Sequence, residues 1–168
     1  MTTSDPGLDD RQLLRSDLVL LDEPSRTDEA VLRRLSALLK KHGLVHASHA
    51  DATVTRERAY PTGLELGTVN AALPHSDTEH VVNNAIAVAV MRAPVDFHHM
   101  ADLERVTKVH VVLMLAISAK EAMVPLLARL ALVLQDGTTL AAMAGSHTPA
   151  AAISALRDGL AAAGESAR

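Results

Sequence analysis

The chain contains no cysteine. This absence excludes disulfide bonds, a thiol nucleophile and any metal site built on thiolates, and it fits a reducing compartment such as the cytoplasm. Aromatic residues are almost missing too, since Tyr60 and Phe97 are the only ones and there is no Trp. A platform on which single-stranded nucleic acid stacks needs several ring faces, so this class of binding protein is close to excluded.

The chain also has no strong excess of one charge and no long apolar run. The formal net charge is −4 and Lys and Arg form no block, whereas nucleic-acid binding depends on clustered cations, so we expect no nucleic-acid partner. The longest apolar run, Val109 to Ile117, contains His110 and is too short to span a bilayer. The polar, acidic N-terminus lacks the features of a signal peptide. We expect a soluble, cytoplasmic protein that does not insert directly into a membrane.

Aliphatic side chains, by contrast, are abundant. Apolar residues make up 48% of the 168 residues, which is enough for one domain with a single core of Leu, Val, Ile, Ala and Met. We place this domain at residues 17–163. Residues 1–16 mix Asp, Ser, Thr, Gly and Pro and predict a flexible N-terminal tail, and residues 164–168 form a short C-terminal tail.

The hydrophobic pattern predicts helices flanking a block of buried strands. Thr27 and Asp28 supply N-cap oxygens for a helix that ends at Gly43, and Ser48 supplies one for a helix over residues 49–59. Four strands and three further helices are expected at residues 17–21, 69–73, 85–91 and 107–117, and at 120–135, 138–144 and 149–163. This order predicts one α/β sandwich with helices over a sheet.

Among the nine histidines, His75 has the most distinctive surroundings. The apolar run Val69 to Leu73 holds the backbone in the sheet, and Pro74 fixes the backbone just before the imidazole. His75 therefore emerges from a stiff strand end, where α/β folds place their functional sites. A neutral imidazole has one free lone pair that can attack phosphorus, provided that an acceptor holds the proton on the other nitrogen. The sequence does not identify that acceptor.

The other histidines give weaker indications. His42 lies in the last turn of a helix, where a structural role suffices. His98 and His99 are adjacent, so on a strand they point to opposite faces and do not easily chelate one ion. His80 follows His75 by five residues, without a matching cluster of metal ligands. We therefore expect no metal and no cofactor, and His80 is either a supporting residue near His75 or an uninvolved surface residue.

Three linked motifs around His75 carry a family resemblance. They are Arg56-Glu57, then Pro61-Thr62-Gly63, then an apolar strand that ends in Pro74-His75. In this order they resemble the IIA domain of the fructose–mannitol class of the bacterial phosphotransferase system (PTS EIIA type 2), and the resemblance extends over residues 17–163. It implies a single-domain α/β sandwich with a mixed central sheet flanked by helices.

The resemblance implies a phosphoryl carrier that acts as a phosphotransferase component. The family's phosphorylated histidine maps onto His75; its phosphate comes from the small carrier HPr and passes to a cysteine of a IIB subunit, while the membrane subunit IIC takes part only indirectly. The family's arginine maps onto Arg56, whose guanidinium would offset the charge of the phosphoryl group. Glu57 would pair with Arg56 or with a backbone group. Asp77 and Glu79 would repel a phosphate, so we expect both to point away from it.

One departure indicates a branch of the family. Mannitol-type members carry a second active-site histidine at the start of the long helix, where this chain has Met123. Galactitol-type members lack that histidine and carry another one shortly after the phosphorylated residue, as His80 does here. The resemblance therefore favours a galactitol-type IIA for sugar or sugar-alcohol uptake, with His80 as a candidate supporting residue.

Two other functions stay open at this level. A regulatory IIA-like phosphoprotein would use the same phosphohistidine to signal its phosphorylation state to a transcription factor or an enzyme. Neighbouring genes for IIB and IIC would favour transport over this alternative. A histidine-dependent metal hydrolase is a third function, and the lack of a ligand cluster opposes it. The sugar itself is not encoded here, because IIC selects it.

Overall fold

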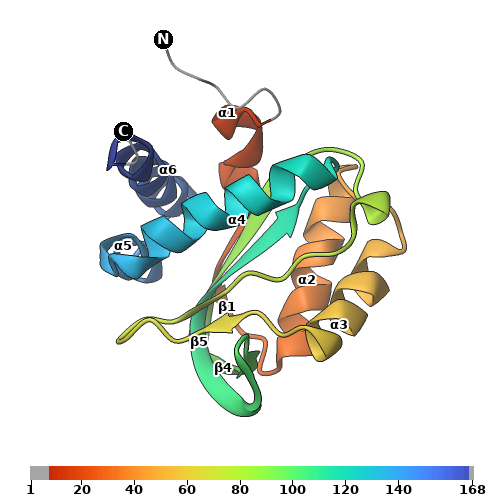
Figure 1. Ribbon diagram of the computed structural model, residues 1–168, viewed down its shortest axis with the longest axis horizontal. Helices are drawn as coiled ribbons and strands as arrows, with labels where there is room; N and C mark the ends of the chain where they lie inside the picture. The colour runs from red at the N-terminus through yellow and green to blue at the C-terminus, as the bar shows by residue number, and fades with distance from the viewer. Residues whose placement is uncertain (1–7, 167–168) are drawn as a thin grey trace.

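The structure is a computed structural model that describes residues 8–166, with helices on both faces of a central sheet (Figure 1). The helices and 3-10 turns are α1 (Asp10–Leu13), η1 (Ser16–Leu18), α2 (Asp28–Lys41), α3 (His49–Ala59), η2 (Thr78–His80), α4 (Lys120–Gln135), α5 (Thr138–Ala144) and α6 (Pro149–Ser166). The strands are β1 (Val19–Glu23), β2 (Gly63–Leu64), β3 (Ala71–Ala72), β4 (Ala85–His99) and β5 (Asp102–Ala116).

The sheet is mixed. Its five strands follow the order β1-β4-β2-β3-β5, and β4 and β5 also pair directly. β4 and β5 form a long antiparallel hairpin, whereas β1 runs parallel to β4 and β3 runs parallel to β5. The prediction of one α/β domain with a mixed sheet flanked by helices is confirmed.

Alternate residues of the central strands face opposite sides of the sheet, as a period of two requires. In β4, Val88 and Val90 belong to the core under α4, α5 and α6, whereas Ala87 and Ala89 belong to the core under α2 and α3. Figure 1 shows these two helical layers on either side of the sheet. Because both faces are covered, both kinds of position are apolar, and the strand reads as a continuous apolar run.

The first predicted helix is confirmed together with its ends. The side chain of Thr27 accepts a hydrogen bond from the backbone nitrogen of Ala30 at 3.1 Å. The helix ends at Lys41, and Gly43 then adopts a φ of +71°, which glycine reaches at little cost. α3 spans the predicted residues 49–59, although Ser48 makes no capping hydrogen bond.

α4 and α5 meet at a sharp bend at Gly137, where φ is +75°. Leu126, Leu130 and Leu140 of these two helices are buried in the core, so both helices pack their apolar faces against the rest of the domain. Within residues 8–166, no single helix is long and apolar enough to cross a membrane; α4 and α5 reach that length and composition only as a pair bent by 84°.

Strand lengths differ from the prediction. β4 and β5 continue through polar residues to His99 and Asp102, because these segments satisfy each other's backbone groups across the hairpin. The prediction ended each strand where its apolar run ends and therefore missed this extension. The predicted strand 69–73 shrinks to Ala71–Ala72, and the predicted strand 17–21 begins at Val19.

The structure also corrects the boundaries of the two predicted tails. Residues 1–7 lie outside the described residues, but Asp10–Leu13 form α1, and Leu13 and Leu14 are buried in the core under α4 to α6. Burial of these two leucines outweighs the polarity of their neighbours. At the other end α6 continues beyond residue 163 to Ser166, and residues 167–168 lie outside the described residues.

Candidate functional site

The backbone at His75 is tied to β5. His75 follows β3 by three residues and forms an isolated parallel bridge with Leu115. The backbone nitrogen of Leu115 donates to the carbonyl of Pro74 at 2.9 Å. The histidine therefore stands at the end of a short strand on a backbone fixed by hydrogen bonds, as the sequence predicted.

The imidazole of His75 is oriented by its own chain. Its Nδ1 lies 2.9 Å from the carbonyl oxygen of Leu73. A carbonyl oxygen only accepts hydrogen bonds, so Nδ1 carries the ring proton and Nε2 keeps the free lone pair of the neutral ring. The acceptor that the sequence left unidentified is thus a backbone carbonyl two residues upstream.

Burial is the main influence on the titration of His75. It lowers the pKa of the imidazole, because the charged form loses solvation, while the hydrogen bond to Leu73 opposes this shift. The nearby charge of Arg56 lowers the pKa of His75 further, and that of Asp77 raises it. The net direction is downward, which keeps the ring neutral and nucleophilic at pH 7.

The structure brings Arg56 to this histidine. Arg56 lies in the last turn of α3, its guanidinium stands over the ring of Tyr60 at 5.5 Å from the centroid, and its Nη1 donates to Oδ1 of Asp77 at 3.2 Å. Its Nε is buried and has no hydrogen-bond partner among the described residues. Arg56 therefore places a fixed positive charge beside His75 with donor capacity to spare.

The expectation for the two acidic residues after His75 needs correction at Asp77. Its carboxylate pairs with Arg56 and acts electrostatically on His75, so it belongs to the site, because the guanidinium attracts it. Glu79 is exposed, and its Oε1 lies 3.4 Å from Nε2 of His80.

Hydrogen bonds of Glu57 connect the Arg56-Glu57 pair to the Pro61-Thr62-Gly63 motif. The buried carboxylate accepts hydrogen bonds from the backbone nitrogen of Thr62 at 2.8 Å and from its hydroxyl at 2.9 Å. Burial raises the pKa of Glu57 to about 7, and the bonds to Thr62 oppose this rise. A Cβ at Gly63 would lie 2.6 Å from the carbonyl oxygen of His98, so only glycine fits there. Of the two partners expected for Glu57, the structure shows the backbone group.

His80 is hydrogen-bonded to the start of α3. Its Nδ1 lies 2.8 Å from Oγ of Ser48, at the start of α3, and its carbonyl accepts from the backbone nitrogen of His46 at 2.9 Å. Among residues 8–166 we find no hydrogen bond or ion pair between His80 and His75. His80 thus ties the segment after His75 to the helix that carries Arg56.

Sequence reasoning missed a second buried histidine. His49 is fully buried, and its Nδ1 lies 2.7 Å from Oγ of Ser36 on α2. Burial, and to a lesser degree the charge of His80, lowers the pKa of His49 to about 4. Ser36 falls on the apolar face of α2, which was the one signal in the sequence; the buried face of α3 is largely polar, so no apolar pattern pointed to His49. Met123, at the position of the second histidine of mannitol-type members, packs partly buried against the core.

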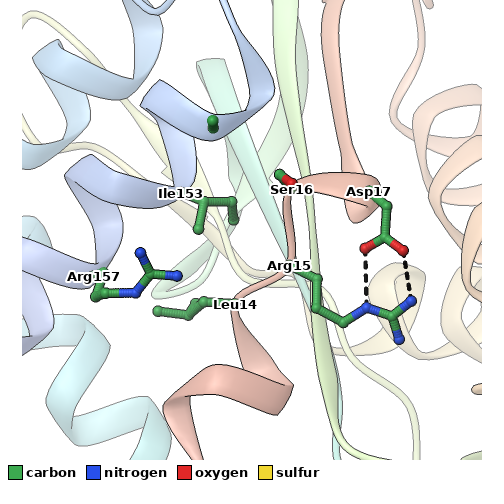
Figure 2. A pocket seen from close by; sticks show the side chains of 7 residues that line it. Leu14, Arg15, Ser16, Asp17, Ile153 and Arg157 are labelled. Atoms are coloured by element: carbon green, nitrogen blue, oxygen red, sulfur yellow. Dashed lines mark hydrogen bonds and ion pairs between the residues drawn. The ribbon is translucent and has the colours of Figure 1, made fainter.

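Cavities and metal ligands do not point to another site. A cavity of about 380 Å³ is lined by Leu14, Arg15, Ser16, Asp17, Ala150, Ile153 and Arg157. Figure 2 shows Arg15 turned toward Asp17, with which it forms two hydrogen bonds of 2.9 and 2.6 Å. None of the residues around His75 lines this cavity, and within the described part of the chain no group of three or more potential ligands could hold a metal ion.

The chain matches the family model of the phosphoenolpyruvate-dependent sugar phosphotransferase system, EIIA 2, over residues 12–159. The chain belongs to this EIIA family. The family consists of phosphoryl-transfer components, which agrees with the chemistry available at His75. The prediction of an EIIA type 2 domain is confirmed. The comparison with curated protein sequences gave no match.

Solved structures support the EIIA fold. A putative PTS IIA (PtxA) from Streptococcus mutans has a TM-score of 0.72 and 15% identity, covering 89% of this chain and 96% of that one. IIA mannitol from Escherichia coli has a TM-score of 0.69 and 21% identity, covering 88% and 98%. The nitrogen regulatory protein IIA-Ntr from Neisseria meningitidis has a TM-score of 0.66 and 19% identity, covering 86% and 96%. At these identities the likeness establishes the fold.

Proposed function

We propose that this EIIA protein accepts a phosphoryl group from phospho-HPr on Nε2 of His75 and passes it to a cysteine of a IIB subunit. The observation that carries the proposal is the imidazole itself. Nδ1 is committed to the Leu73 carbonyl at 2.9 Å, so the free lone pair is on Nε2. Arg56 stands beside it as the counter-charge. No resident metal or cofactor is required for this chemistry.

The transfer needs little beyond position and charge. The Nε2 lone pair of His75 forms the bond to phosphorus while the bond between phosphorus and the donor histidine breaks, and its electron pair returns to that donor's nitrogen. Nδ1 of His75 keeps its proton throughout and donates it in the hydrogen bond to the Leu73 carbonyl. Arg56 offsets the charge on the equatorial oxygens through charge-assisted hydrogen bonds. The second step repeats this displacement with a IIB thiolate as nucleophile.

Transport of a sugar is the favoured setting. Solved relatives include a complex of IIAMTL with phosphorylated IIBMTL from Escherichia coli, at a TM-score of 0.68 and 20% identity, covering 89% of this chain and 97% of that one. By analogy we propose a IIB partner here, with IIC reached only through IIB and the protein soluble in the cytoplasm. Met123 in place of a second histidine, with His80 close after His75, favours the galactitol-like branch.

A regulatory role is the second candidate. The likeness to IIA-Ntr from Neisseria meningitidis is of the same order as the likeness to the mannitol proteins. In this setting the phosphorylation state of His75 would be the signal, and no phosphate would need to reach a sugar. Neighbouring IIB and IIC genes favour transport; an isolated or regulatory gene context favours signalling.

The proposal is tested by phosphorylation in vitro. The protein is incubated with phosphoenolpyruvate, Enzyme I and HPr, and acid-labile phosphate is measured on it. We expect label on the wild type and none on His75→Ala. An unlabelled wild type would overturn the carrier function, whereas label that persists in His75→Ala would overturn only the site assignment. Addition of a purified IIB subunit should then remove the label from the wild type.

A further inference from the structure

In the free protein Asp77 is already paired with the positive charge of Arg56, which a phosphoryl group on His75 would also need. Nη1 of Arg56 and Oδ1 of Asp77 are 3.2 Å apart. Both charges act on the imidazole of His75 in opposite directions. The free protein therefore already holds an anion on the arginine whose charge acts on His75.

The two partners differ in how firmly they are held. Arg56 is anchored in α3, its guanidinium stands over Tyr60, and its Nε is buried. The side chain of Asp77 is 74% exposed, against 37% for Arg56. Solvent-exposed ion pairs contribute little stability, so the Asp77 carboxylate can leave the guanidinium at small cost, whereas Arg56 stays in place.

Building on the carrier function proposed above, we propose that Asp77 is the resident counter-anion of Arg56 and that phosphorylation of His75 displaces it. The negative charge of Asp77 then repels the phosphoryl group and makes the phosphohistidine easier to discharge. Before transfer, one carboxylate balances one guanidinium. After transfer, the phosphoryl group adds close to two negative charges while Arg56 supplies only one positive charge. The excess negative charge beside the N–P bond favours release to the next acceptor. Asp77 thus acts through its negative charge and tunes how long the phosphate stays.

Phosphoramidate tests this without any partner protein. Its amine is protonated near neutral pH, so when Nε2 of His75 attacks phosphorus the P–N bond breaks and its electron pair leaves on ammonia. Wild type and Asp77→Asn are phosphorylated in this way, freed of reagent, and followed by ³¹P NMR for hydrolysis of the phosphohistidine. The equilibrium of each phosphoprotein with HPr is measured in parallel.

A matched control is available between β1 and the middle of β4. Asp22 forms an exposed ion pair with Arg92, at 2.9 Å and with 70% of the Asp22 side chain exposed. Asp22 has a φ of +49°, which asparagine tolerates. Asp22→Asn therefore removes the same charge from the same kind of pair, away from His75.

The expected result is a phosphohistidine that lasts roughly three- to tenfold longer in Asp77→Asn, with the equilibrium with HPr shifted toward the phosphoprotein by a similar factor. Asp22→Asn should match the wild type, and Asp77→Glu should restore the shorter lifetime. A lifetime and equilibrium in Asp77→Asn within twofold of the wild type would overturn the role of Asp77 alone. Failure of the wild type to take phosphate on His75 would overturn the carrier function and this role with it.

Discussion

At the scale of single residues, burial and three neighbouring groups set the protonation state of the His75 imidazole. Burial lowers the pKa of His75, the Leu73 carbonyl raises it, the charge of Arg56 lowers it and that of Asp77 raises it. The folded-state pKa lies below the value of about 6.5 for an unperturbed histidine. His75 is therefore more often neutral near pH 7 than an exposed histidine, and a neutral ring is the form that attacks phosphorus.

Replacing Arg56 by Ala should change both titration and transfer. Because Arg56 lowers the pKa of His75, Arg56→Ala should raise it, and histidine ¹H–¹⁵N NMR measures that shift directly. Loss of the guanidinium should also slow phosphoryl uptake from phospho-HPr by roughly 10- to 100-fold. Arg58→Ala is the control, because Arg58 is an exposed arginine on the same helix, paired with Glu29. Equal slowing in both variants would contradict a specific role for Arg56.

At the scale of secondary structure, the buried face of α3 is largely polar. His49, Thr53 and Glu57 recur every four residues on its buried face. His49 contacts Ser36 of α2, and Glu57 accepts two kinds of hydrogen bond from Thr62. A helix fixed in this way keeps a defined rotation about its axis, since each bond has a direction that apolar contacts lack. That rotation aims Arg56 at the segment after His75.

The contact between Ser48 and His80 should matter for transfer through the same helix. His80→Ala removes the link at 2.8 Å between the two elements, so phosphoryl uptake should slow several-fold while the fold persists. Ser48→Ala should produce the same effect, and the double variant should be no worse than either single one. Unchanged uptake and phosphohistidine lifetime in His80→Ala would rule out a supporting role.

The buried His49 should make the protein sensitive to acid. Its folded-state pKa of about 4 lies below the unfolded value, so the unfolded chain binds more protons at intermediate pH. The stability due to neutral His49 is complete above pH 6.5 and is lost as pH falls toward 4. Between pH 7 and 4.5, the wild type should lose roughly 2 to 3 kcal/mol more free energy of unfolding than His49→Gln. Urea denaturation at both pH values measures the difference.

Glu57 should contribute a pH dependence of the free energy of unfolding that is opposite in sign to that of His49. Its pKa is raised to about 7, so its contribution to stability is present below pH 4.5 and is lost as pH rises through 7. Its pH dependence is therefore opposite to that of His49. In His49→Gln the pH dependence due to Glu57 should become visible. If His49→Gln loses stability on acidification as steeply as the wild type, the assignment to His49 is contradicted.

At the scale of the whole molecule, the site joins segments from different parts of the chain: residues 56–63, residues 73–80 and β5. The sequence predicted the helices from α2 onward and the position of His75 at a strand end, because hydrophobic periodicity and N-cap residues are local signals, whereas the mixed sheet was implied by the family resemblance. It did not predict the Asp77 partner of Arg56 or the Ser36 partner of His49, because side-chain pairing depends on how the helices are rotated. Similarly, the polar half of the hairpin is held by backbone bonds that leave no apolar pattern.

The N-terminal segment offers the last test of how far the domain extends. Leu13 has no exposed surface and belongs to the core under α4 to α6, although it lies in a polar stretch. Leu13→Ala should therefore lower the free energy of unfolding by about 2–4 kcal/mol through lost burial and a cavity. Gln12→Ala, on an exposed position of the same short helix, should change it by less than about 0.5 kcal/mol. Urea denaturation distinguishes the two, because a mobile tail would leave both variants as stable as the wild type.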